Sequence, residues 1–230
     1  MPVLSTLNYL CLGPILNFNY VTTEVLKLIA ARMRCLRGLR IQQCFSVDEV
    51  IDISPVTEIK TLEALKLHGI KRTWTHWVDW SPLKKLRKLY LDLWWWGSNS
   101  FTHRGVGRFT HLKQLCLWDS KSYNIVDVCQ LKELNVLFLC HPTVEMLELL
   151  AHNLKQLKTF TFSVEAASHI ECTQLVCRIF RQAVTLQVLF PVDMETVCTR
   201  RPDGVFETDT RHRSWPKHKL TSFQEFDNPE

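Results

Sequence analysis

The pattern Leu-x-x-Leu-x-Leu recurs along the 230-residue chain and constrains its fold more than any other feature. Four copies begin at Leu62, Leu86, Leu112 and Leu134. Four further copies begin at Leu7, Leu36, Leu157 and Leu186, and the last three are relaxed, with Ile41, Phe160, Phe162 and Pro191 at the substituted positions. Successive starts are separated by 29, 26, 24, 26, 22, 23 and 29 residues. A register kept over that length predicts one structural unit per copy.

The spacing within a copy indicates a short strand. Leu65 and Leu67 are two residues apart, as are the last two apolar positions of every copy, so they point to the same side of a strand. One unit cannot cover its own apolar face, and neighbouring units must therefore stack with parallel strands about 4.8 Å apart. The sequence predicts an α/β solenoid of about eight units, a curved horseshoe segment with strands on the concave face and helices on the convex face.

Helices are predicted where apolar residues recur on one face between the strands. The three sets are Val21, Val25, Leu28 and Ile29; Val144, Leu147 and Leu150; and Leu175, Val176, Ile179 and Phe180. Thr23 and Thr143 precede the first two helices as plausible caps, each with a glutamate in the first turn. We expect residues 1–192 to form the repeat domain and residues 193–230 a C-terminal tail or cap, part of which can be disordered.

Residues 21–44, VTTEVLKLIAARMRCLRGLRIQQC, resemble the cysteine-containing type of leucine-rich repeat, in which a helix leads into LxxLxLxxC and Cys44 takes the cysteine position. That type is typical of F-box proteins, the substrate receptors of cullin-based ubiquitin ligases. Later copies depart from it, with Ile70, Trp94, Ser120 and Pro142 at the cysteine position. The F-box would precede the repeats and dock a Skp-type adaptor. The chain opens on a repeat near Met1, so we expect a fragment, truncated isoform or incomplete gene model, and we assign no adaptor-binding residues.

The residues that flank the strand leucines are predicted to line the concave face. The middle column is Cys11, Arg40, Lys66, Tyr90, Cys116, Phe138, Thr161 and Phe190. Two further columns flank it, running from Tyr9 to Val188 and from Gly13 to Val192. The predicted partner-binding residues are a basic group followed by large apolar side chains: Arg40, Lys66, His68, Lys88, Tyr90, Trp118, Val136 and Phe138. Exposed aromatic residues in a patch are typical of protein-binding sites.

Two alternatives remain open for these apolar side chains. The tail from Asp193 can fold back over them through Phe206, Trp215, Phe223 and Phe226, or its mixed charges and prolines can leave it disordered. We also predict that one or two of Trp94, Trp95 and Trp96 reach the rim of the concave site. Replacing Trp118 and Phe138 together by alanine is then expected to abolish partner capture and preserve the fold.

No catalytic or cofactor site is indicated by the sequence. His169, Cys172 and Cys177 lack the second ligand pair of a structural zinc site, and Cys140 and His141 are adjacent on a strand and point to opposite faces. Glycine-rich phosphate loops, nucleophile elbows and HExxH motifs are absent from the sequence. We therefore expect neither an enzyme nor a cofactor.

The composition and cysteine pattern limit the compartment and the partner. The chain is 46% hydrophobic, has no run long enough to span a membrane, and carries nine scattered cysteines, so we expect a reduced cytoplasmic or nuclear environment. The predicted function is protein binding, most readily as the substrate-recognition repeats of an F-box-type receptor. The alternative is an adaptor or regulatory scaffold with no link to ubiquitination. Nucleic-acid binding through the basic group is not expected.

Overall fold

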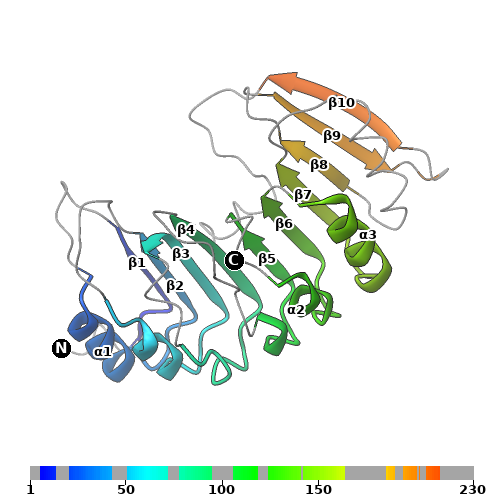
Figure 1. The fold of residues 1–230 in the computed structure, drawn as a ribbon. Coiled ribbons are helices and arrows are strands. Elements are labelled where there is room, and N and C mark those ends of the chain that lie inside the picture. The colour runs from blue at the N-terminus through cyan, green and yellow to red at the C-terminus, as the bar shows by residue number, and fades with distance from the viewer. Residues whose placement is uncertain are drawn as a thin grey trace.

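The computed structural model describes residues 6–13, 21–42, 51–71, 78–94, 106–118, 124–140, 142–163, 185–189, 194–200, 202 and 206–212. Ten strands within this described part form one sheet, in chain order from β1 to β10 (Figure 1). Of these described strands, the first eight pair in parallel with their neighbours. Strands β9 and β10 continue the sheet with antiparallel pairing. The predicted α/β class and parallel strand order are confirmed.

The strands of the parallel part follow the predicted copies of the leucine pattern. They are β1 (Tyr9–Leu12), β2 (Gly38–Gln42), β3 (Ala64–Lys71), β4 (Lys88–Trp94), β5 (Gln114–Leu117), β6 (Val136–Cys140), β7 (Thr159–Ser163) and β8 (Thr185–Leu189). The segment expected to be a tail or cap contributes β9 (Met194–Arg200) and β10 (Phe206–His212). These two strands follow no leucine pattern, and the sequence did not predict them.

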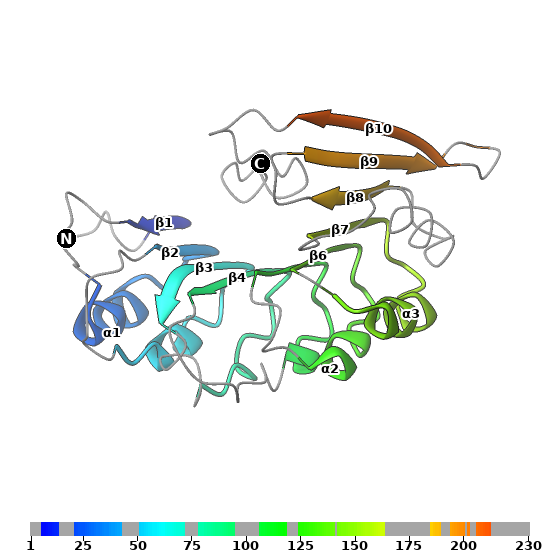
Figure 2. The same cartoon turned by 45° about the horizontal axis from the view of Figure 1, so that its top comes forward.

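Helical segments connect several strands and lie on one side of the sheet, below it in Figure 2. They are α1 (Thr23–Arg32), α2 (Ile125–Cys129), α3 (Val144–Asn153) and the 3-10 segments η2 (Ser54–Glu58) and η4 (Val106–Arg108). Figure 2 also shows that the row of strands bends away from the helices. In the described part of the chain, each helix is too short or too polar to span a lipid bilayer. We call the opposite side of the sheet, which none of the described helices covers, the helix-free face.

The main core lies between the sheet and the helices. Leu65 and Leu67 of β3 are fully buried there, as the two-residue spacing predicted, and the equivalent pairs of the neighbouring strands join the same core. Leu26 and Ile29 of α1 pack into it from the helical side. Burying one such aliphatic side chain contributes about 1.5 to 3 kcal/mol.

One turn is repeated before each strand from β2 to β7. A buried apolar residue accepts a hydrogen bond at its carbonyl from the amide of the leucine three residues later, as from Leu62 to Ile59 and from Leu134 to Leu131. The accepting residues are Met33, Ile59, Leu83, Phe109, Leu131 and Leu154. The turn therefore fixes an extra apolar position, three residues before each first leucine, that the sequence analysis did not include.

The helix ends differ from the prediction at one cap. Thr143 caps α3 as predicted, and its hydroxyl accepts from the Met146 amide at 3.3 Å. The cap of α1 is Thr22 instead of Thr23, because the Thr22 hydroxyl accepts from the Val25 amide. Leu28 was predicted to face the core but is 56% exposed. The predicted helix around Leu175 lies outside the described residues.

The eighth copy was predicted in the wrong register. Phe160 and Phe162 of β7 pair with Leu186 and Val188 of β8, not with Leu189 and Pro191. The strand starts three residues earlier than the pattern required. Leu186 and Val188 are apolar and two residues apart, so they provide the same spacing as Leu189 and Pro191. Pro191, in addition, has no amide hydrogen to donate to a neighbouring strand.

Candidate protein-binding face

The middle column of the helix-free face is in register across the parallel strands. Cys11 pairs with Arg40, Arg40 with Lys66, and the row continues through Tyr90, Cys116, Phe138 and Thr161. These seven positions match the prediction. The eighth member is Gln187 and not Phe190, because of the register of β8. The side columns likewise place Gln114 between Lys88 and Val136, and His68 beside Asp92.

The first half of this face is polar and half-buried. The Arg40 guanidinium donates to the Gln42 side-chain oxygen at 3.1 Å. The Lys66 ammonium lies 4.5 Å from the centre of the Tyr90 ring, which is a cation–π contact. Lys88 stands in the side column of β4 and is also half-buried. The structure thus brings together the four basic residues that the sequence predicted.

Asp92 was not among the predicted site residues, and it changes the charge of this half. Its carboxylate oxygen lies 2.5 Å from Nδ1 of His68, and the two side chains are 17% and 32% exposed. The Nδ1 atom has no hydrogen-bond partner of good geometry, so this short contact is not a directed hydrogen bond. The signal available in the sequence was the equal offset of His68 and Asp92 from their strand leucines.

The second half of the face is an apolar cluster, and the expectation that its aromatic residues are exposed is wrong. Phe138 is fully buried and Tyr90 is 8% exposed. The cluster also contains Ala64, Cys116 and Cys140, with Trp118 and Val136 packed against it and partly buried. The Trp118 and Phe138 ring centres are 4.5 Å apart. These side chains pack against one another, and Tyr90 and Phe138 do not form an open patch.

Burial also sets the chemistry of the polar atoms in this cluster. Desolvation raises the pKa of the Tyr90 phenol and of the Cys116 thiol, so both groups stay protonated at neutral pH. The Trp118 indole N–H and the Gln114 side-chain oxygen are buried, and neither makes a hydrogen bond in the described structure. Such groups are costly to leave unpaired. They are a donor and an acceptor on the same side of β5.

Several predicted residues lie outside what the structure describes. The side chain of Trp94 is not described, and Trp95 and Trp96 fall outside the described residues, so their place at a rim stays a prediction. The side chain of Phe206 is not described, and Trp215, Phe223 and Phe226, the other tail residues predicted as a cover for the apolar side chains, lie outside the described residues. The residues considered and set aside as zinc or catalytic groups also lie outside them: His141, His169, Cys172 and Cys177.

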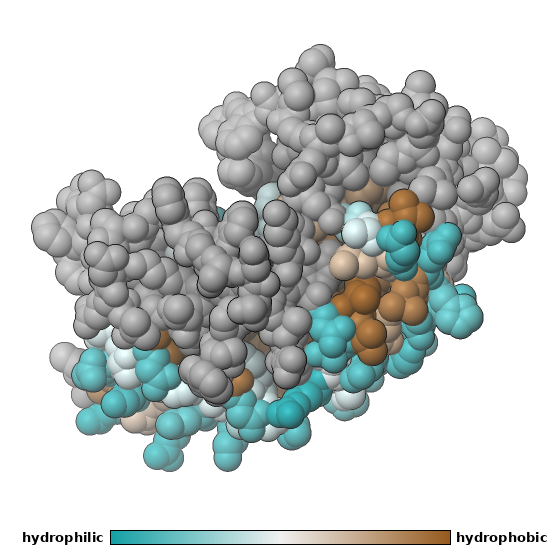
Figure 3. Space-filling view, in the orientation of Figure 1, coloured by the Kyte–Doolittle hydropathy of each residue, from teal (hydrophilic) through white to brown (hydrophobic). Residues whose placement is uncertain are grey.

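An apolar patch on the helical side was missed by the sequence analysis. Val126 of α2 is 54% exposed, and Val144 and Leu149 of α3 are also exposed. Figure 3 shows this hydrophobic region over the two helices. The periodicity of α3 had placed Val144 in the core, but the residue follows directly on the Thr143 cap and lies at the end of the buried stripe.

No protein-family model matches the chain, and no curated protein sequence matches it.

Proposed function

We propose that this chain is a leucine-rich-repeat protein and that its helix-free face binds another polypeptide. One observation carries the proposal: side chains of successive parallel strands stand in register on a sheet face that the described helices do not cover. A parallel sheet is normally covered by helices on both faces. A face that the described helices leave uncovered, lined by rows of side chains from separate strands, favours recognition of an extended surface.

The polar half of the face is the part that we expect to touch the partner. Arg40, Lys66, His68 and Lys88 are half-buried, so they are held by neighbours and still reach solvent. Asp92 adds an acceptor beside His68. A polypeptide with exposed acidic and amide groups would complement this arrangement. Tyr90 supports Lys66 from below, and the apolar cluster with Trp118, Val136 and Phe138 serves as its rigid base.

The biological role that fits best is substrate recognition in ubiquitin-dependent turnover. The support is the resemblance of residues 21–44 to the repeats of F-box receptors, together with a face suited to holding a polypeptide. On this proposal about eight repeats form the horseshoe segment, and a Skp-type adaptor is engaged only through an F-box elsewhere in the full-length product. The second candidate is an adaptor or scaffold that binds through the same face without ubiquitination.

The binding face is tested by site-specific photo-crosslinking. A benzoylphenylalanine replaces Cys11, which is exposed in the middle column, or Lys66. Matched controls carry it at Lys27 of α1 or Glu148 of α3, both exposed on the helical side. We expect polypeptide adducts in cells from positions 11 and 66 and none from 27 and 148. Adducts confined to the helical positions, or none at all, would refute the proposed face.

The two roles are separated by the fate of the crosslinked protein. If the chain is a ubiquitin-ligase receptor, depleting it should lengthen the half-life of the captured partner. An unchanged half-life together with retained crosslinking would support the scaffold and exclude the receptor.

A further inference from the structure

The edge of the sheet where strands β2 to β7 begin carries a surface that the proposed function does not use. The residue just before each strand donates its amide hydrogen to the carbonyl of its counterpart one strand earlier, for example Glu63 to Arg37 at 2.7 Å and Lys113 to Arg87 at 2.8 Å. These bonds hold six residues in one row, which we call the strand-start row: Arg37, Glu63, Arg87, Lys113, Asn135 and Lys158. Successive members are about 4.8 Å apart.

A second row stands at the corners of the repeated turn. Three residues before each member of the strand-start row lies an exposed turn residue, and five of the six are basic: Arg34, Lys60, Lys84, Thr110, Lys132 and Lys155. The next residue of each turn forms a third row: Cys35, Thr61, Lys85, His111, Glu133 and Gln156. The same turn hydrogen bond recurs six times, so the corners project in the same way from each unit.

The three rows together, which we call the basic edge, concentrate the charge of the molecule. They hold ten Lys or Arg and two Glu, a formal net charge of +8, whereas the whole chain carries +5. The remainder of the chain is therefore net negative. A linear array of one sign attracts partners of the opposite sign and speeds their encounter.

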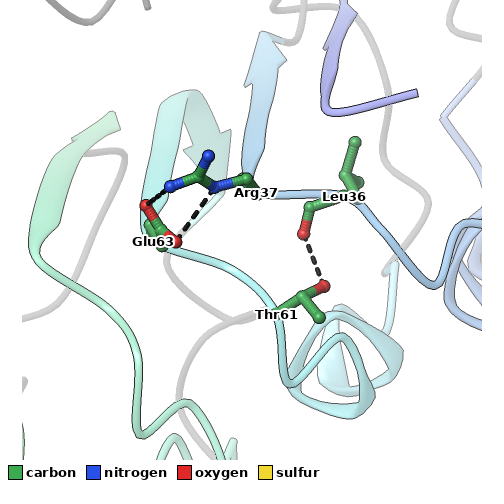
Figure 4. A network of polar contacts seen from close by, with 4 residues as sticks. All are labelled: Leu36, Arg37, Thr61 and Glu63. Carbon is green, nitrogen blue, oxygen red and sulfur yellow. Dashed lines mark hydrogen bonds and ion pairs between the residues drawn. The ribbon is translucent and has the colours of Figure 1, made fainter. Parts of the chain in front are cut away.

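Contacts within the protein neutralise only part of this charge. The Arg37 guanidinium donates two hydrogen bonds to the Glu63 carboxylate, at 3.0 and 2.8 Å, and the Thr61 hydroxyl donates to the Leu36 carbonyl beside them (Figure 4). Glu133 lies 2.7 Å from the His111 ring. This contact, with Arg87 and Lys113 nearby, keeps the pKa of the Glu133 carboxyl below its usual value.

Most of the lysines form no ion pair with a carboxylate of the described residues. Lys132 and Lys155 donate to the main-chain carbonyls of Asn153 and Ala151 at the end of α3, which are dipoles and not counter-ions. Within the described part of the chain, Lys60, Lys84 and Lys113 form no ion pair with a carboxylate, although Lys113 lies near enough to Glu133 to help lower its pKa.

We infer that the basic edge binds an extended acidic segment of polypeptide. The row spans about 24 Å over six units, the length of about seven extended residues. None of its eighteen residues is Phe, Tyr or Trp, the side chains on which single-stranded nucleic acids stack, and Glu63 and Glu133 interrupt it. Seven of its ten cations are lysines, compact charges that suit carboxylates spaced along a chain.

The test measures fluorescence anisotropy of a labelled peptide of about ten alternating Asp and Glu residues, at low salt. A charge-reversed protein, Lys84→Glu with Lys113→Glu, is compared with a control that changes net charge equally on α1, Lys27→Glu with Arg32→Glu. We expect the first to weaken binding about tenfold and the control less than about twofold. A milder variant, Lys84→Gln with Lys113→Gln, gives a smaller loss in the same direction if reversal disturbs folding.

Three results would overturn the inference. Equal weakening by both charge reversals would mean that only net charge matters. If the acidic peptide does not bind at low salt, the basic edge is not a binding surface for acidic polypeptide. Tighter binding of a single-stranded oligonucleotide of equal length would assign the edge to nucleic acid instead. Crosslinking from position 66 does not depend on any of these three results. The inference about the basic edge and the proposed binding face can therefore be refuted separately.

Discussion

Phe138 and Leu28 are two apolar residues whose burial differs from what their sequence patterns predicted. Phe138 occupies the middle column, where the pattern predicted an accessible side chain, yet it is fully buried beside Trp118. Leu28 fits a helical stripe, yet it is more than half exposed. Residue periodicity predicts the face of an element but not the depth at which a side chain lies. Depth depends on packing from parts of the chain far away in sequence, which the local pattern does not contain.

Replacing Phe138 by alanine should therefore destabilise the fold. We expect the free energy of unfolding to fall by about 3 to 5 kcal/mol, because the change opens a cavity in a closed cluster. The exposed control Leu28→Ala should change it by less than about 0.5 kcal/mol. Urea unfolding followed by circular dichroism measures both. If Phe138→Ala lowers the free energy of unfolding no more than Leu28→Ala does, the buried cluster is contradicted. Because Phe138→Ala is expected to destabilise the fold, it is unsuitable as a pure binding probe.

Strands were predicted more accurately than the connections between them. The pattern from Leu36 to Phe162 located six consecutive strands, because a two-residue period and one buried face leave a single register. The eighth copy was misplaced since β8 offers two apolar pairs, and only pairing with β7 decides between them. Strands β9 and β10 form by antiparallel pairing with the end of the sheet, which no repeat pattern encodes.

Strand β3 contains a local irregularity that the pattern did not predict. Its register with β4 shifts between His68 and Ile70, and Gly69 between them has a φ of 67°. Only glycine adopts this left-handed conformation without steric cost. The bulge follows directly on His68, and beyond it β3 pairs with β4 again, Ile70 with Leu93 and Lys71 with Trp94, in a register shifted by one residue.

Gly69→Ala should consequently cost about 1 to 2 kcal/mol of stability, since an L side chain at positive φ is strained. Gly13→Ala is a matched control, because an added methyl group there meets nothing within 4 Å. The midpoint of thermal unfolding should fall for the first variant and stay nearly unchanged for the second. Equal midpoints would mean that the bulge is absent.

At the scale of the whole molecule, the fold gives two separate surfaces from one repeated unit. Each unit adds one strand to the helix-free face and one turn to the basic edge, so both surfaces lengthen with the number of units. The face could be predicted because strand residues alternate in a simple way. The edge could not, because its three rows become neighbours only when the turns stack with the same hydrogen bond. Both depend on strict register from strand to strand.

That register is tested most directly by engineered disulfides along the strand-start row. Lys113→Cys with Asn135→Cys places two cysteines on neighbouring units, about 4.8 Å apart, within the range that a disulfide requires. Lys113→Cys with Lys158→Cys places them two units apart, at about 10 Å, beyond that range. Under mild oxidation, peptide mapping by mass spectrometry should find the 113–135 bridge in high yield and no 113–158 bridge. Efficient formation of the 113–158 bridge, or failure of the 113–135 bridge in folded protein, would contradict the stacked parallel arrangement.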